Sequence, residues 1–146
     1  MSSIQLLTQF LTLLSCALFA GAAVYVTLVE HPARMECGTA IAVTEFAPSY
    51  RRAAIMQASL AALGLVCAII TWWASENLCW LIGGILLGFV IPFTLLVIFP
   101  TNQQLLDPTL DTSSDHAREL LLRWGRLHAV RSALSVIALV LFLLNV

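Results

Sequence analysis

Residues 78–99 read LCWLIGGILLGFVIPFTLLVIF, an apolar run that contains no charged side chain. A helix needs about 20 such residues to cross the hydrocarbon core of a bilayer, where backbone groups must be hydrogen-bonded within the helix. Three further stretches meet this requirement, at residues 4–29, 53–74 and 129–146. The sequence therefore predicts an all-α integral membrane protein, a bundle of four transmembrane helices.

The composition of the whole chain agrees with this prediction. Of its 146 residues, 60% are hydrophobic and 10% are charged, which lies outside the usual range of soluble domains. The net charge is −1, and the seven basic residues, all arginines, form no run that would follow a phosphate backbone. We therefore expect one membrane domain over residues 1–146, with the lipid bilayer and not nucleic acid as its partner.

The connections between the predicted spans decide the topology. Residues 75–77 are too few for anything except a tight turn between two antiparallel helices. The other two connections, residues 30–52 and 100–128, are predicted to be long loops, and they must share one side of the membrane. All seven arginines lie in or beside these two loops. Because basic residues near span ends are retained in the cytoplasm, we expect both loops there and both termini outside.

A separate pattern precedes the fourth span. In residues 115–127, apolar residues recur at helical spacing with charged residues between them. This pattern predicts a short amphipathic helix lying in the membrane interface, with Trp124 as an aromatic anchor.

Polar residues gather at one end of the predicted spans, where ionisable groups are often functional because they are costly in a membrane. The set comprises Glu30 and His31 after the first span, Arg51 before the second, Asn102 after the third, and His128 and Arg131 at the start of the fourth. If the helices form a compact bundle, these residues converge on a polar pocket at its cytoplasmic mouth. Asn102 has a second interpretation, as the cap of a helix that starts after Pro100.

Trp124, His128 and Arg131 are separated by four and three residues, so they share one face of a helix. If this face points inward, Arg131 gains Glu30 as a natural counter-charge. If it points outward, Arg131 extends its guanidinium to the interface and His128 rests there. We favour the inward interpretation.

Two histidines and a carboxylate are the smallest set that holds a transition metal. No HxxxH or ExxH spacing is present, and the adjacent side chains of Glu30 and His31 diverge by about 100° on a helix. We therefore predict no metal and no cofactor.

Proline and glycine mark further features of the spans. Pro32 is predicted to end the first helix, and Pro92 to kink the third. Gly83, Gly84 and Gly88, with a further glycine in the second span, are predicted to permit close helix packing.

Five short segments stand out along the chain. They are Gly-Ala-Ala-Val-Tyr at 21–25, Val-Glu-His-Pro-Ala at 29–33, Pro-Ser-Tyr-Arg-Arg at 48–52, Pro-Thr-Asn at 100–102, and Trp-Gly-Arg-Leu-His at 124–128 followed by Arg131. Together these segments resemble the anthrone-oxygenase-like family of small four-helix membrane proteins. The resemblance covers nearly the whole chain. It implies a membrane oxidoreductase, of the monooxygenase type, that oxidises a lipophilic phenolic substrate with molecular oxygen.

A chemical rationale accompanies the resemblance. An anthrone has an acidic C–H bond beside an aryl ketone, and a histidine can remove that proton. We therefore expect His31 and His128 as the catalytic acid–base residues. Glu30, Arg51, Asn102, Trp124 and Arg131 are expected to bind the substrate, and Asn102 or Arg131 to stabilise the oxygen that gains charge.

Two other functions remain open. The chain could be a non-catalytic subunit or assembly partner of a larger membrane complex, with a structural polar layer, and a homo-oligomer is also compatible with the sequence. A transporter is the weakest interpretation, because no span carries a charge at mid-membrane depth.

Overall fold

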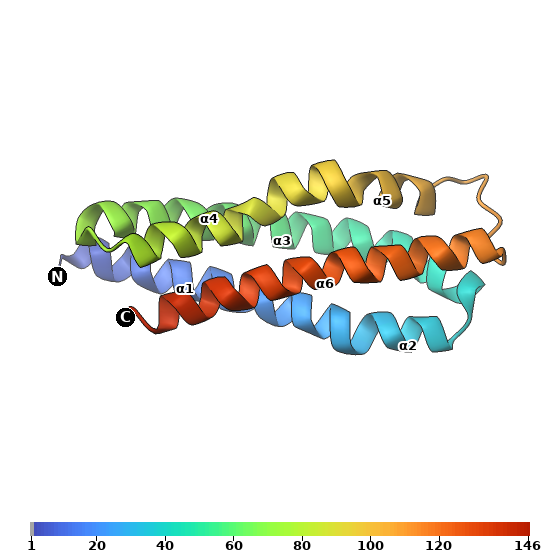
Figure 1. Ribbon diagram of the computed structural model, residues 1–146, viewed down its shortest axis with the longest axis horizontal. Coiled ribbons are helices and arrows are strands. Elements are labelled where there is room, and N and C mark those ends of the chain that lie inside the picture. The colour runs from blue at the N-terminus through green and yellow to red at the C-terminus, as the bar shows by residue number, and fades with distance from the viewer. Residues whose placement is uncertain (1) are drawn as a thin grey trace.

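The computed structural model describes residues 2–146, and within that range all regular structure is helical. Figure 1 shows the helices lying lengthwise beside one another. The elements are α1 (Ser3–Tyr25), η1 (Val26–Glu30), α2 (His31–Glu36), α3 (Thr39–Ser75), α4 (Leu78–Phe93), η2 (Thr94–Ile98), α5 (Phe99–Leu105) and α6 (Asp115–Leu143), where η denotes a π-helical turn. Both termini lie at the end of the bundle that also holds the α3–α4 turn (Figure 1).

Consecutive elements join into four helices that are long and apolar enough to cross a membrane: Ser3–Glu36, Thr39–Ser75, Leu78–Leu105 and Asp115–Leu143. The helices α1 and α4 each pack against both α3 and α6, so the four surround a common core. The predicted four-helix membrane bundle is thus confirmed, and the chain is a multi-pass membrane protein.

The prediction that Pro32 ends the first helix is wrong. Pro32 follows η1, in which the His31 N–H donates to the Val26 carbonyl oxygen, and the helix continues into α2. Pro100 follows η2 in the same way. Proline lacks an N–H and its ring presses on the preceding turn. A wider π-helical turn before it changes the hydrogen-bond register, so the helix continues past the proline.

The segments predicted to be long loops are therefore mostly helical. The first connection shrinks to residues 37–38, where Gly38 has a φ of 94°, a conformation that residues with a Cβ rarely adopt. The second connection is confined to residues 106–114.

The amphipathic segment 115–127 is the first half of α6 and not a separate interfacial helix. Ser114 begins this helix, since its Oγ accepts a hydrogen bond from the Ala117 N–H at 3.1 Å. The apolar face around Leu121 and Trp124 is buried in a cluster with residues of α3 and α5. The predicted membrane-surface placement is corrected for this reason: the apolar face has protein partners, and the helix continues into the span.

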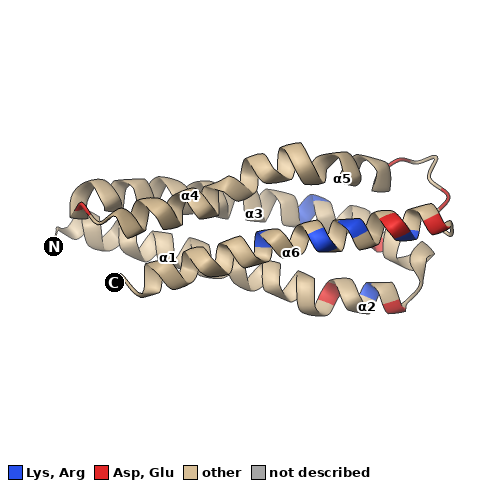
Figure 2. Ribbon diagram, viewed as in Figure 1, with Lys and Arg blue, Asp and Glu red and all other residues tan. Residues whose placement is uncertain are grey.

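Charged residues occupy one end of the bundle (Figure 2). Glu76, in the α3–α4 turn, is the one charged residue near the termini, and the others lie between Glu30 and Arg52 or between Asp107 and Arg131. We call the region around Trp124, His128 and Arg131 the charged half.

The region around Gly64, Gly83, Gly84 and Gly88, which we call the terminal half, is closely packed. A Cβ at Gly84 would lie 2.8 Å from the Ala68 Cβ, and one at Gly83 would lie 2.5 Å from the nearest atom of the Phe142 ring. The predicted role of these glycines in close helix packing is confirmed. Trp80 stacks on Phe142 beside them, with ring centroids 5.2 Å apart.

Candidate functional site

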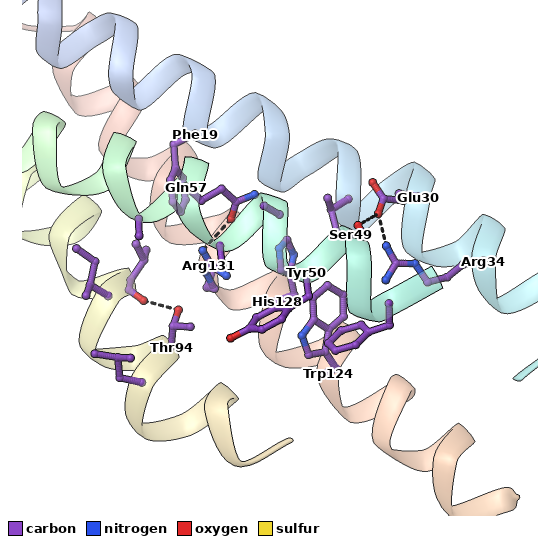
Figure 3. A pocket seen from close by; sticks show the side chains of 18 residues that line it. Phe19, Glu30, Arg34, Ser49, Tyr50, Gln57, Thr94, Trp124, His128 and Arg131 are labelled. Carbon is purple, nitrogen blue, oxygen red and sulfur yellow. Dashed lines mark hydrogen bonds and ion pairs between the residues drawn. The ribbon is translucent and has the colours of Figure 1, made fainter. Parts of the chain in front are cut away.

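A cavity of about 160 Å³ lies within the bundle and is lined by residues of all four long helices. Its wall is mainly apolar and aromatic, with a few polar side chains. The residues shown in Figure 3 include Phe19, Glu30, Arg34, Ser49, Tyr50, Gln57, Thr94, Trp124, His128 and Arg131. Among all lining residues, only Ala58 of α3 and Leu95 of η2 are exposed. Ala58 and Leu95 therefore mark where the cavity wall reaches the outer surface of the bundle, on α3 and η2.

Trp124 is the centre of an aromatic stack beside the cavity. Its ring centroid lies 4.8 Å from that of His128, with 28° between the two ring planes, and 5.3 Å from that of His31. Phe46 meets the same indole edge-on at 5.3 Å, and the Arg34 guanidinium lies 5.7 Å from its centroid. These contacts hold both histidines in fixed positions, because each ring has a large rigid neighbour.

An ion-paired cluster forms one end of the cavity. The buried Arg34 guanidinium bonds the Glu30 carboxylate one turn before it, and its Nε lies 2.9 Å from Glu45 of α3. Ser49 also donates to Glu30, at 2.8 Å. The expected pair of Glu30 with Arg131 is therefore wrong: continuation of the helix past Pro32 places Arg34 on the same face as Glu30, much nearer than Arg131.

Arg131 has a different environment. Its Nη2 donates to the Gln57 side-chain oxygen at 2.8 Å, and its guanidinium lies 5.5 Å from the Phe19 ring centroid. Within residues 2–146, no carboxylate forms an ion pair with it. Figure 3 shows Arg131 and Gln57 together on the cavity wall. A cation of this kind, placed in an apolar wall with only a neutral amide partner, is suited to binding an anionic group.

Comparison with protein families matches residues 46–141, more than half of the chain, to the anthrone oxygenase family. The chain belongs to the anthrone oxygenase family. No curated protein and no solved structure matches it. The matched segment includes Trp124, His128 and Arg131, whereas Glu30 and Arg34 precede it.

Of the predicted site residues, four line the cavity of this family member: Glu30, Trp124, His128 and Arg131. His128 is buried, and Trp124 and His128 both face the interior, so the inward interpretation of their shared helix face is confirmed. The predicted convergence of polar residues on a pocket is therefore only partial: those of the first and fourth spans line the cavity.

Three predicted site residues lie outside the cavity lining. His31 contacts the Trp124 ring and lies against Gly125, where an added Cβ would collide with its imidazole. Arg51 is exposed. Asn102 is buried inside α5 rather than capping it, and neither atom of its side-chain amide has a hydrogen-bond partner in the described chain. Their proposed roles in substrate binding or catalysis stay predictions.

Several residues of the site were not predicted from the sequence. Arg34 follows Glu30 by four residues, which is the spacing of a helical ion pair, but the expected helix end at Pro32 concealed it. Gln57 is a polar residue within an apolar span, a signal that could have identified it. Thr27 and Ser132, which bond to His128 and to each other, have no distinguishing pattern in the sequence.

Few side chains that could bind a metal ion lie near the two histidines. The two histidines both contact the Trp124 ring, and no hydrogen bond joins them in the described residues. Across residues 2–146, no three His, Cys, Asp or Glu side chains gather closely enough to hold a metal ion. The expectation of no metal and no cofactor stays a prediction.

Proposed function

We propose that this chain oxidises a lipophilic ketone with an acidic C–H bond, of the anthrone type, with molecular oxygen in the cavity described above. The observation that carries the proposal is the placement of His128 and Arg131 one turn apart on the wall of a single apolar cavity. A base and a cation in this arrangement can remove a proton and stabilise the oxygen that gains charge.

The first step is proton removal. The His128 imidazole takes a proton from the methylene carbon beside the aryl ketone, and the electron pair of that C–H bond delocalises onto the ketone oxygen. Arg131, oriented by Gln57, stabilises the resulting phenolate-like anion. The neighbouring aromatic side chains of Phe46 and Trp124 suit a flat ring system.

The second step uses molecular oxygen as the oxidant. The electron-rich anion reduces oxygen, and a C–O bond forms at the same carbon to give a peroxide anion. His128 returns its proton to this anion, which gives a hydroperoxide. His128 then takes the second hydrogen of that carbon as a proton, and the electron pair of this C–H bond forms the new carbonyl while the O–O bond breaks and hydroxide leaves. The released hydroxide takes the proton held by His128 and leaves as water. One oxygen atom therefore ends in the quinone and the other in water.

The cavity size limits how the substrate lies. A cavity of about 150 Å³ holds a single benzene ring, and the volume here is about 160 Å³. A three-ring substrate would place one end inside and extend the other past Ala58 and Leu95, where we place the entrance. Because this side of a membrane-spanning bundle would face lipid, a substrate that partitions into the bilayer could enter without crossing water.

The orientation belongs to the same proposal. The arginine distribution favours a cytoplasmic position for the charged end and an external one for both termini. In a variant without the native cysteines, Glu76→Cys should react with an impermeant thiol reagent in intact cells, and Asp111→Cys should not. The reverse labelling would overturn the orientation and leave the fold unchanged.

The activity is tested with the purified protein in lipid nanodiscs. Oxygen uptake and quinone formation are measured over a panel of anthrones, after subtraction of the rate without protein. We expect uptake and quinone in equal amounts for at least one anthrone. No rate above the background over the whole panel would contradict this substrate class and favour a non-catalytic role in a membrane complex.

A further inference from the structure

Two hydroxyl groups lie behind His128, on the side away from the reaction proposed above. Thr27 Oγ1 is 3.1 Å from His128 Nδ1 and 2.7 Å from Ser132 Oγ. Ser132 Oγ is in turn 2.9 Å from the Ala23 carbonyl oxygen and 3.3 Å from the carbonyl oxygen of His128 itself. These atoms form a chain of hydrogen bonds that links α6 to α1 and η1.

The donor in each of these hydrogen bonds can be identified by counting the available hydrogens. Each hydroxyl has one hydrogen to donate, and a carbonyl oxygen can only accept. If Ser132 donated to Thr27, the Ser132 and Ala23 oxygens would face each other at 2.9 Å without a hydrogen between them. Ser132 therefore donates to Ala23, which leaves Thr27 to donate to Ser132. Thr27 then has only acceptor capacity left for His128, so the imidazole must donate from Nδ1.

From this geometry we infer that Thr27 and Ser132 are positioning residues that fix neutral His128 in the Nδ1-protonated tautomer. Nε2 then carries the lone pair. Among the described residues, Nε2 has no hydrogen-bond partner, and the His128 side chain forms part of the cavity wall. The inference deepens the proposed function and rests on it for its catalytic meaning, since it identifies the nitrogen that acts as the base. The tautomer itself can be measured without any substrate.

The terminal half offers a matched example without a histidine. There Thr71 Oγ1 donates to Thr8 Oγ1 at 2.9 Å, and the pair joins α3 to α1. Hydroxyl pairs of this type commonly link membrane helices. Removal of the Thr71 hydroxyl should therefore affect only stability. Removal of the Thr27 hydroxyl should also change which ring nitrogen of His128 carries the proton. This difference separates a positioning role from ordinary helix association.

The test is a nitrogen–proton NMR correlation spectrum of the full-length protein labelled with ¹⁵N-histidine in lipid nanodiscs. The His128 signals are assigned by their loss in His128→Gln. We expect the wild-type ring to carry its proton on Nδ1. Thr27→Val, which keeps the side-chain shape but removes the hydroxyl, should shift the population towards the Nε2-protonated form. Thr27→Ser should restore the wild-type pattern, and Thr71→Val should leave it unchanged.

Turnover is the second readout. We expect Thr27→Val to lose about 10–100-fold in kcat, by analogy with the loss found when groups that hydrogen-bond metal-binding histidines are removed, and Thr27→Ser to recover most of it. An Nε2-protonated ring in the wild-type protein, or a Thr27→Val spectrum identical to wild type, would overturn the inference. The expected spectra without activity against any anthrone would uphold the tautomer and instead contradict the proposed function.

Discussion

The terminal half and the charged half of the bundle use the same four helices in different ways. In the terminal half, glycines bring the helices so close that an added Cβ at Gly84 would collide with Ala68. The charged half instead contains both π-helical turns, the Glu30–Arg34 ion pair and a cavity between the helices. Close packing favours stability, and the cavity reduces it in exchange for room for a ligand.

This difference means that stability and chemistry should respond to substitutions in separate places. A change in the terminal half should alter unfolding and leave the activity of the folded protein intact. A change at the cavity wall should do the opposite. Substitutions that affect both properties equally, wherever they lie, would break the comparison.

The largest effect is expected at His128. His128→Gln keeps the approximate size and the hydrogen-bonding capacity of the side chain but removes the titrating base, so turnover should fall by about 10²–10⁴-fold. The midpoint of thermal unfolding should change little. The matched control is His116→Gln, at an exposed histidine near the start of α6, which should retain wild-type turnover. Wild-type turnover in His128→Gln would remove this residue as the base.

The next effect is expected in the terminal half. Gly84→Val places branched carbon against Ala68, which has no flexible side chain to move away, and it should destabilise the fold by about 1–3 kcal/mol. Unfolding in mixed detergent measures this loss. Gly21→Val is the control, because no atom lies within 4 Å of a Cβ added there. Equal stability of the two variants would show that the glycines do not determine the packing.

A smaller effect is expected at the opening of the cavity. Ala58→Phe should obstruct the gap beside Leu95 and lower kcat/KM for a three-ring substrate by about tenfold, the scale of a modest steric change in an apolar pocket. Ala62→Phe adds the same ring one turn further along α3, outside the cavity lining, and should have no such effect. If both variants lose the same activity, the substrate does not enter between α3 and η2.

The smallest effect is expected for the hydroxyl pair of the terminal half. Thr71→Val removes the bond to Thr8 and should destabilise the protein by about 0.6 kcal/mol, the average for such bonds between membrane helices. A double-mutant cycle with Thr8→Val isolates the interaction. A large fall in turnover from this cycle would show that the two halves are not independent.

Much of the fold could be predicted from the sequence because membrane spans have a simple requirement, a long apolar run. The helix ends could not be predicted in the same way. Pro32 ordinarily ends a helix, and nothing in residues 26–30 signals the π-helical turn that accommodates it. The prediction of a separate interfacial helix at 115–127 is wrong because an amphipathic pattern does not distinguish a membrane surface from a protein partner.

The site was predictable only where helical spacing links residues along one element. Trp124, His128 and Arg131 belong to one helix face, and the structure places all three on the cavity wall. Pairing between helices depends on rotation and depth, which the sequence does not give. For this reason the sequence predicts an ion pair of Glu30 with Arg131 and not the observed pair with Arg34. The roles of the Thr27 and Ser132 hydroxyls cannot be predicted either, because such residues are common in membrane helices.

The central claim is that His128 removes a proton from an acidic carbon of the substrate, and this step can be measured without oxidation. Under strictly anaerobic conditions in D₂O, NMR follows the exchange of the methylene hydrogens of an anthrone with solvent deuterium. We expect wild-type protein to accelerate this exchange above the rate without protein, and His128→Gln to return it to that rate. Equal acceleration by wild type and His128→Gln would contradict the claim.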